Sequence, residues 1–346
     1  MSRPRTSDCL RSVWIAPGIL VLCSASIASA APTTVNGDPF TLVATGPGTA
    51  QLFGLTSDAL GRVYAGNNSN NTTGISVQLF DPALYLGAAI AMQDFGAPVG
   101  DADGLTFGGG AIYAADRDEG IRRIATPAAT SSVFTSGAGI NPTGSPVVYR
   151  PVDGHVFVGF GATVTGAPGA NRIDEFDSAG SLVQTLSPVG EPETMTFSAT
   201  SGLIYYADFD SEVRSFNPIT GADLHVSNVT GVIDGGLTFD ELTGLLFVGT
   251  ANGVNSGRVE TINPANGAST LFASGFEGSL GILREPVSGN LYFLESNQLY
   301  RIDSGLVVPE PGRAVLYGLG LLAILSCCKP KLHCAPKRRL SWRGAA

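Results

Sequence analysis

The sequence contains no lysine and no cysteine between residues 31 and 308, and only two histidines there, His155 and His225. A stretch without cysteine cannot form disulfides, so its stability must come from a hydrophobic core and from strand pairing. Lysine and cysteine nucleophiles are also excluded, and no serine stands in a Gly-x-Ser-x-Gly elbow. The sequence therefore gives little support to nucleophilic catalysis, and we expect both histidines to be packing or surface residues.

Basic residues are scarce in the same stretch. It holds ten arginines against 27 acidic residues, a formal charge of −17, and the remaining basic residues lie at the two ends of the chain. A surface of this charge repels nucleic acid and anionic glycans unless cations bridge it. We therefore exclude nucleic acid as a partner.

The N-terminal end has the three parts of a secretory signal peptide. Its basic n-region carries Arg3, Arg5 and Arg11. Residues 13–27 are mostly apolar, and the small residues Ala28 and Ala30 provide a cleavage site before Ala31. The pattern predicts a mature protein that begins at Ala31, and an uncleaved N-terminal anchor is the alternative.

A short apolar run follows a Pro-Glu-Pro box near the C-terminal end. The box is Val308-Pro309-Glu310-Pro311, and the apolar run covers residues 314–328. As a helix, these 15 residues span about 22 Å, against about 30 Å for the hydrocarbon core of a bilayer, so the run is a marginal membrane anchor. Basic residues follow it: Lys329, Lys331, Lys337, Arg338, Arg339 and Arg343.

These three ordered parts resemble the PEP-CTERM sorting signal of exported proteins in Gram-negative bacteria. The resemblance covers residues 308–343. It implies that the tail holds the protein transiently in the inner membrane, and that an exosortase-type protease processes it. The protein would then pass to the cell surface or to extracellular polysaccharide. The alternative is an ordinary C-terminal anchor whose basic flank stays in the cytoplasm.

Between the two ends, six segments repeat the same order of short apolar strands and glycine-containing turns. The clearest copies are Gly236–Gly249 and Thr194–Ala207. The equivalent positions of the six first strands are Leu55, Leu105, Val147, Met195, Leu237 and Ile282. These positions follow one another at intervals of 42 to 50 residues. Repeats of about 40–50 residues with four strands each are typical of propeller blades.

The sixth repeat lacks a fourth strand, because the chain runs from Gln298–Asp303 directly into the tail. The missing strand is predicted at the start, where Phe40–Gly46 resembles fourth strands such as Ser269–Gly275. We therefore predict an all-β propeller of six four-stranded blades closed by an N-terminal strand, plus a C-terminal transmembrane helix at about 314–328. Seven blades, or a sandwich of the same strands, remain alternatives. The predicted parts are the signal peptide 1–30, the propeller ectodomain 31–307 and the sorting signal 308–346.

The repeats resemble the broad superfamily of NHL, YVTN and gluconolactonase-like propellers, through phrases such as Gly289–Phe293 and Phe216–Gly221. Gluconolactonase-like members bind a catalytic divalent metal at one mouth of the central channel. The loops that enter first strands, and those that join second to third strands, emerge on one face. Their acids are Asp101, Asp103, Asp116, Asp118, Glu119, Glu191, Glu193, Asp208, Asp210, Glu212, Asp234, Glu277 and Glu295.

This mapping predicts one acidic face. Its candidate ligands for Ca²⁺, which takes six to eight oxygen atoms, are Asp103, Glu193, Asp234 and Glu277. The alternative is that these acids cap turns and keep a surface protein soluble. Two loops on the same face, residues 67–74 and 161–169, are rich in Asn, Thr, Gly or Ala and suit contacts with sugar hydroxyls, and the alternative is that they are only tolerated surface length.

The sequence favours an exported cell-surface or matrix-associated propeller that acts as a non-enzymatic binding or adhesion module. One alternative is a secreted Ca²⁺-dependent hydrolase of the lactonase type. Another is a periplasmic scaffold still held by its tail. No residue is assigned a catalytic role.

Overall fold

The computed structural model describes residues 32–303 apart from 36, 38, 48–50, 69–75, 100–101, 103, 117–119, 136–144, 161–170, 209–210, 232–235, 251–256 and 277–279. The predicted cleavage site at Ala28, Ala30 and Ala31 lies outside the described residues, as do the Pro-Glu-Pro box and the predicted membrane helix. Within the described residues, no helix is long and apolar enough to cross a membrane.

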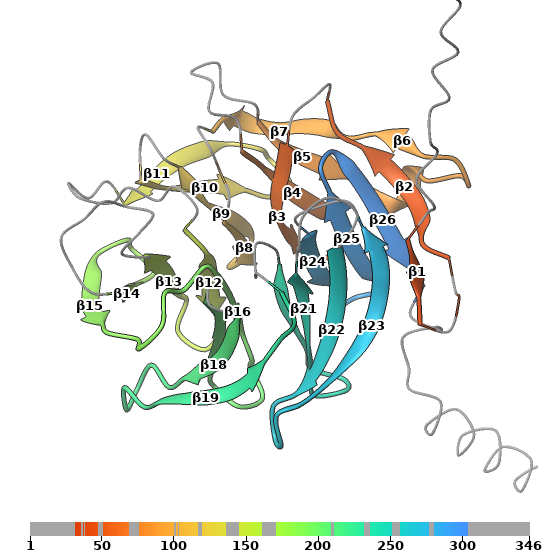
Figure 1. The fold of residues 1–346 in the computed structure, drawn as a ribbon. Helices are drawn as coiled ribbons and strands as arrows, with labels where there is room; N and C mark the ends of the chain where they lie inside the picture. The colour runs from red at the N-terminus through yellow and green to blue at the C-terminus, as the bar shows by residue number, and fades with distance from the viewer. Residues whose placement is uncertain are drawn as a thin grey trace, which may run out of the picture. The chain divides into compact units, whose positions relative to one another are not determined.

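The described strands form six sheets, one for each repeat (Figure 1). Blade 1 consists of β3 (Gln51–Ser57), β4 (Val63–Asn68), β5 (Ser76–Phe80) and β7 (Gln93–Pro98), with the 3-10 helix η1 (Pro82–Leu84) after β5. Blade 2 consists of β8 (Leu105–Gly108), β9 (Ala111–Asp116), β10 (Gly120–Ala125) and β11 (Ser131–Thr135). Blade 3 consists of β12 (Val147–Arg150), β13 (His155–Phe160), β14 (Arg172–Phe176) and β15 (Leu182–Leu186).

The other three blades follow the same order. Blade 4 consists of β16 (Thr194–Phe197), β17 (Ile204–Ala207), β18 (Glu212–Phe216) and β19 (Asp223–Asn228). Blade 5 consists of β20 (Leu237–Asp240), β21 (Leu245–Thr250), β22 (Gly257–Asn263) and β23 (Ala268–Phe276), with β1 (Thr33–Thr34) at its outer edge. Blade 6 consists of β24 (Leu280–Arg284), β25 (Leu291–Glu295), β26 (Gln298–Ile302) and β2 (Thr41–Thr45), with β6 (Ile90–Ala91) at its outer edge.

The blades follow one another around a closed ring. The first strands contact each other in the order β3, β8, β12, β16, β20 and β24, and β24 contacts β3 again. Each of the six positions that define the repeat lies on one of these inner strands. The prediction of a six-bladed propeller is therefore confirmed.

An N-terminal strand closes the ring, as the sequence predicts. Strand β2 pairs antiparallel with β26, from Thr41 opposite Arg301 to Thr45 opposite Gln298. Its Val43 is fully buried, and Phe40 beside it packs edge-on against Phe293 at a ring-centroid distance of 4.7 Å. The pairing removes an open sheet edge and joins the two ends of the propeller.

Two short pairings were not predicted. Strand β1 pairs with β23, and β6 pairs in parallel with β2, each over two residues. Segments this short leave no alternating pattern in a sequence, because two residues contain a single period of a strand.

The alternation of strand direction gives the ring two different faces. First and third strands run toward one face, which we call the turn face, because the tight turns after them lie there. Second and fourth strands run toward the opposite face, the loop face, where the variable connections begin. Glu193, the one acid of the predicted metal site within the described residues, stands before β16 at the loop face.

Candidate functional site

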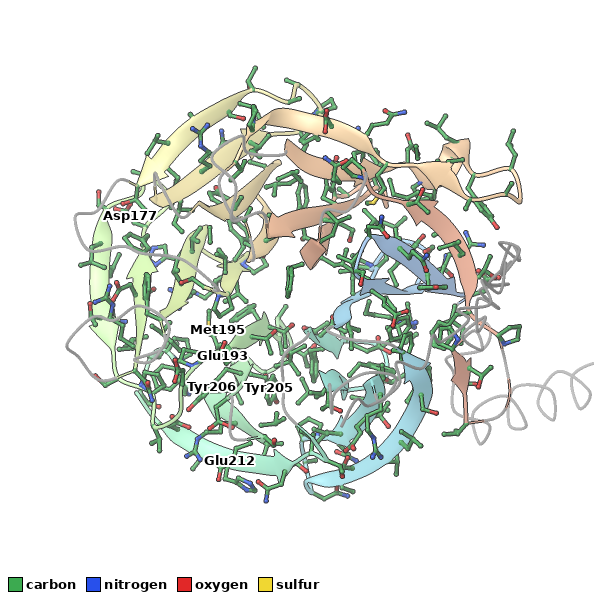
Figure 2. All side chains as sticks on the ribbon, turned by 45° about the horizontal axis from the view of Figure 1, so that its top comes forward. Asp177, Glu193, Met195, Tyr205, Tyr206 and Glu212 are labelled. Atoms are coloured by element: carbon green, nitrogen blue, oxygen red, sulfur yellow. The ribbon has the colours of Figure 1, made fainter. Side chains whose placement is uncertain are left out.

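Five of the acids expected on the loop face have described side chains: Glu191, Glu193, Asp208, Glu212 and Glu295. Of the four candidate Ca²⁺ ligands, only Glu193 belongs to this set, and the other three lie outside the described residues. Glu193 is half-buried just before β16, nearer the ring axis than Glu212 (Figure 2), and its N–H donates to the Ala207 carbonyl over 3.0 Å. Convergence of the four ligands stays a prediction.

Two of the loop-face acids are held by their own blade. Asp208 is buried, and its Oδ1 accepts the N–H of Glu212 over 2.9 Å across the turn between β17 and β18. Glu212 pairs with Arg214, with 2.8 Å between Oε2 and Nη1. Asp208 therefore caps a turn, as the alternative reading of these acids predicts.

A polar network extends this arrangement across blade 4. Asp223 accepts hydrogen bonds from Arg214 Nε over 2.9 Å, from the Tyr206 hydroxyl over 2.7 Å and from the Val189 N–H over 2.7 Å. Burial and the hydrogen bond to Asp223 raise the pKa of Tyr206. The network fixes the chain that leads from blade 3 into blade 4.

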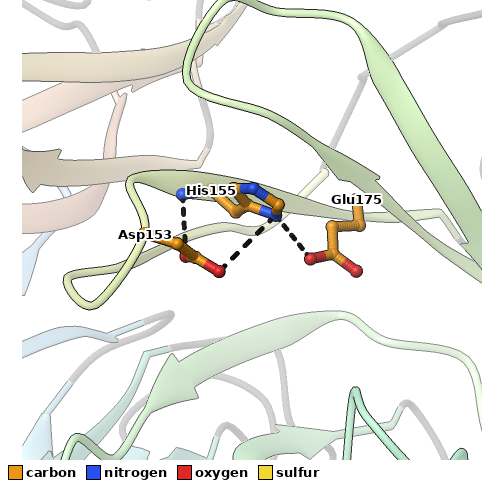
Figure 3. A group of neighbouring side chains, drawn as sticks. All are labelled: Asp153, His155 and Glu175. Carbon is orange, nitrogen blue, oxygen red and sulfur yellow. Dashed lines mark hydrogen bonds and ion pairs between the residues drawn. The ribbon is translucent and has the colours of Figure 1, made fainter.

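A second polar cluster lies on the turn face of blade 3, where the sequence predicts no site (Figure 3). Asp153 and His155 flank the end of the turn between β12 and β13, and Glu175 lies on β14. Their ligand atoms all lie within 4.8 Å of one another, and no other such group of three occurs among the described residues. A histidine and two carboxylates are a donor set that suits zinc.

A cation of the protein itself occupies the centre of this cluster. Arg150 Nη2 lies 2.5 Å from Glu175 Oε1, 2.6 Å from Asp153 Oδ2 and 3.1 Å from His155 Nδ1. The guanidinium carbon also stacks over the Phe157 ring, 4.8 Å from its centroid. The two carboxylate oxygens bind this nitrogen and the imidazole lies beside it, so the guanidinium fills the space between the three side chains.

Charge and burial explain why the cluster is stable. Glu175 is almost fully buried, at 2% exposure, and its second oxygen accepts a hydrogen bond of 2.6 Å from Gln184. The hydrogen bond from Arg150 lowers the pKa of Asp153. Burial lowers the pKa of Arg150, but its bonds to Asp153 and the charge of Glu175 outweigh this and raise it. The buried carboxylate is therefore fully satisfied.

The short distance of 2.6 Å between His155 Nδ1 and Glu175 Oε1 assigns the imidazole proton. A carboxylate has no proton to give, so Nδ1 carries the hydrogen and donates it to Glu175. His155, which was expected to be a packing or surface residue, is half-buried and belongs to a polar network with Arg150 and Glu175. His225 on β19 bonds Asn228 over 3.2 Å.

Sequence reasoning missed this cluster because its members come from two hairpins. Asp153 and His155 are neighbours in the sequence, but Glu175 comes 20 residues later. Only the strand register, which places Glu175 opposite Phe157, brings it beside them. The Arg-x-x-Asp-x-His order at 150–155 is the one local signal.

Comparison with known proteins supports the fold. No family of protein sequences and no curated protein matches this chain. A gluconolactonase from Xanthomonas campestris is similar in structure, with a TM-score of 0.59 at 13% identity, over 79% of this chain and 94% of that one. A structure of a nidogen/laminin complex matches with a TM-score of 0.45 at 16% identity, over 75% of this chain and 90% of that one. The first likeness shows a shared propeller fold.

Proposed function

We propose that this chain is an exported propeller that its PEP-CTERM-like tail delivers to the cell surface or matrix, where it binds a ligand without catalysis. The observation that supports it most is the completeness of the ring at Ile302. Strand β2 supplies the fourth strand of blade 6, so the tail is not needed to complete the described fold. The tail is then free to act as a sorting signal.

The charge of the domain narrows its ligand. A formal charge of −17 between residues 31 and 308 disfavours anionic polymers, whereas hydroxyl-rich neutral polysaccharide meets no such repulsion. The connections after β4 and β13 are rich in Asn and Thr, and in Gly, Ala and Thr, respectively. Such side chains and exposed backbone groups hydrogen-bond sugar hydroxyls. We therefore propose neutral extracellular polysaccharide as the ligand and the loop face as the binding surface.

Binding is tested with the protein that producing cells release, applied to neutral polysaccharide purified from their matrix. A variant with residues 69–75 replaced by a Gly-Ser segment of equal length should bind at least tenfold more weakly. The matched control replaces the exposed turn residues 219–221 on the opposite face. Equal binding by both variants and the wild type would exclude the loop face.

The fold likeness to a gluconolactonase supports a second candidate, Ca²⁺-dependent hydrolysis of lactones. Glu193 lies nearer the ring axis than Glu212, and Asp103, Asp234 and Glu277 precede inner strands of other blades in the sequence. A bound ion would stabilise the protein by about 2.7 kcal/mol at 100 times its Kd. Millimolar Ca²⁺ should then raise the melting temperature, and Glu193→Gln and Glu277→Gln should abolish both this rise and lactone turnover. An unchanged melting temperature argues against the metal site.

A further inference from the structure

The turn face carries aliphatic side chains at the tips of four of its six first hairpins. They are Leu60, Val152, Leu242 and Val287, and their exposed fractions are 72%, 84%, 78% and 61%. A single exposed aliphatic residue is ordinary on a protein surface. These four differ because they recur at the same place in the repeat.

Three of the tips belong to the same kind of turn. Val152, Leu242 and Val287 each stand two residues before a glycine with positive φ, as Gly244 shows at +70°. The Gly244 N–H donates to the Asp240 carbonyl over 2.8 Å and closes the turn, and the equivalent bonds close the other two. The three turns therefore share one hydrogen bond and one glycine position on equivalent strands. Leu60 forms the tip of a shorter turn in blade 1.

One acidic residue in each of three of these turns lies beneath the tip, whereas Asp153 beside Val152 and Glu241 beside Leu242 are exposed. Asp58, Asp240 and Glu285 are at most 3% exposed. Each accepts the N–H of the tip residue itself: Leu60 over 2.9 Å, Leu242 over 3.1 Å and Val287 over 2.5 Å. The carboxylates of Asp58, Asp240 and Glu285 are therefore bound inside their turns, while the aliphatic tips above them are exposed.

The four tips are spread around the ring. Blades 1, 3 and 5 alternate in the closed order of six blades, and Val287 adds a fourth point on blade 6. Tips on three alternate blades surround the central axis and together define a plane that crosses it. A narrow partner such as a single helix would reach only some of them, whereas a flat surface reaches all four together.

The chain leaves the propeller on this same face. Strand β26 is the third strand of its blade and runs toward the turn face, where it ends at Ile302. The apolar run 314–328 begins 11 residues after Asp303, which allows at most about 40 Å of extended chain. If this run lies in a membrane, the turn face is held close to the surface of that membrane.

We propose that the turn face docks on a zwitterionic lipid surface, with Leu60, Val152, Leu242 and Val287 inserted among the headgroups. This step rests on the proposed role of the tail as a membrane anchor. Docking of the turn face would hold the loop face away from the membrane, where it is free to bind ligand. The net charge of −17 predicts weaker docking on anionic lipid than on zwitterionic lipid.

Tryptophan fluorescence tests the docking, because residues 31–308 contain no tryptophan. The full chain with Trp14→Phe and Trp342→Phe is reconstituted in phosphatidylcholine vesicles with or without brominated acyl chains. Leu242→Trp places a probe at a tip. The control is Leu224→Trp, at a site that is 64% exposed on the outer strand β19. We expect bromine to quench the probe at 242 at least twofold and to leave the probe at 224 unchanged.

A second variant shows whether the tips act together. Changing the other three tips to serine should reduce quenching at 242 at least threefold, with the far-UV circular dichroism unchanged. Replacing half of the lipid by the anionic lipid phosphatidylglycerol should also reduce the quenching at 242.

Flotation of the vesicles separates the two proposals. Protein that floats without quenching at 242 keeps the tail anchor and overturns the docking, and so does equal quenching at 242 and 224. Protein that does not float overturns both. If the fluorescence of the probe at 242 changes when residues 314–328 are deleted in the absence of lipid, the tail covers the turn face. If it changes with protein concentration, a second copy covers the turn face. Either result overturns lipid docking.

Discussion

Replacing Arg150 by alanine should convert the turn-face cluster of blade 3 from an ion-pair network into a zinc site. The substitution removes the one cation that lies between Asp153, His155 and Glu175, and leaves their ligand atoms within 4.8 Å of one another. Tetrahedral zinc with ligands at about 2.1 Å requires about 3.4 Å between ligand atoms. The separations of His155 Nδ1 from Glu175 Oε1, 2.6 Å, and from Asp153 Oδ2, 3.8 Å, lie on either side of this value.

The magnitude follows from burial. The side chains of Arg150 and Glu175 are 12% and 3% exposed, so removing one partner strands a buried charge, which costs about 3–5 kcal/mol. Gln184 and His155 still contact Glu175, so the expected loss of unfolding free energy is about 3 kcal/mol, at the low end of this range. The pair with Asp153, whose side chain is 35% exposed, adds little. Zinc at 100 times its Kd would restore about 2.7 kcal/mol.

The assay is urea unfolding of the wild type and of Arg150→Ala, each with and without micromolar zinc. Zinc should stabilise the variant and leave the wild type unchanged. Arg62→Ala is the matched control, because Arg62 also pairs with a buried carboxylate, Asp58 at 2.5 Å, but no histidine joins that pair in the described structure. It should lose stability and show no response to zinc. Equal stabilisation of the wild type and Arg150→Ala, or no response in the variant, would refute the placement of the guanidinium at a cation position.

Three further predictions concern the stability of the ring. Val43→Asp places a charge in the fully buried closing strand and should cost more than about 4 kcal/mol in chemical unfolding, whereas the exposed Thr41→Asp should change little. Gly104→Ala puts a Cβ into a backbone carbonyl of the chain that leads into blade 3, and should lower stability by about 2–4 kcal/mol. Because Arg150 lowers the pKa of Asp153, the stability from Asp153 is complete above its unfolded pKa of about 4 and is lost as the pH falls through the lower folded value. Arg150→Ala should therefore show a shallower fall in unfolding free energy below pH 4.

The fold was predictable because it repeats. Leu55 and its five counterparts mark the inner strands at a spacing that only a blade architecture explains, and glycines such as Gly244 end the first turns in positive-φ conformations. The closing strand was predictable because Phe40–Gly46 has the composition of other fourth strands. Strands β1 and β6 were not, since two residues carry no period.

The candidate sites were predictable only in part. Loop-face acids could be assigned to a face from the order of strands alone, but whether Glu193 meets the other candidate ligands depends on loop conformations that no pattern encodes. The cluster around Glu175 depends on register and on the direction of the Arg150 side chain. The tips at Leu242 and Val287 were visible in the sequence as aliphatic residues, but only the turns show that they point outward.

Delivery of a finished propeller by its tail is tested most directly by fractionating producing cells that express the wild type or Glu310→Ala. On the proposal that the Pro-Glu-Pro box is processed, the wild type should be found at the surface and in the medium. The variant should accumulate in the inner membrane with its propeller folded. Equal amounts of released protein from the two would contradict the proposed role of the tail.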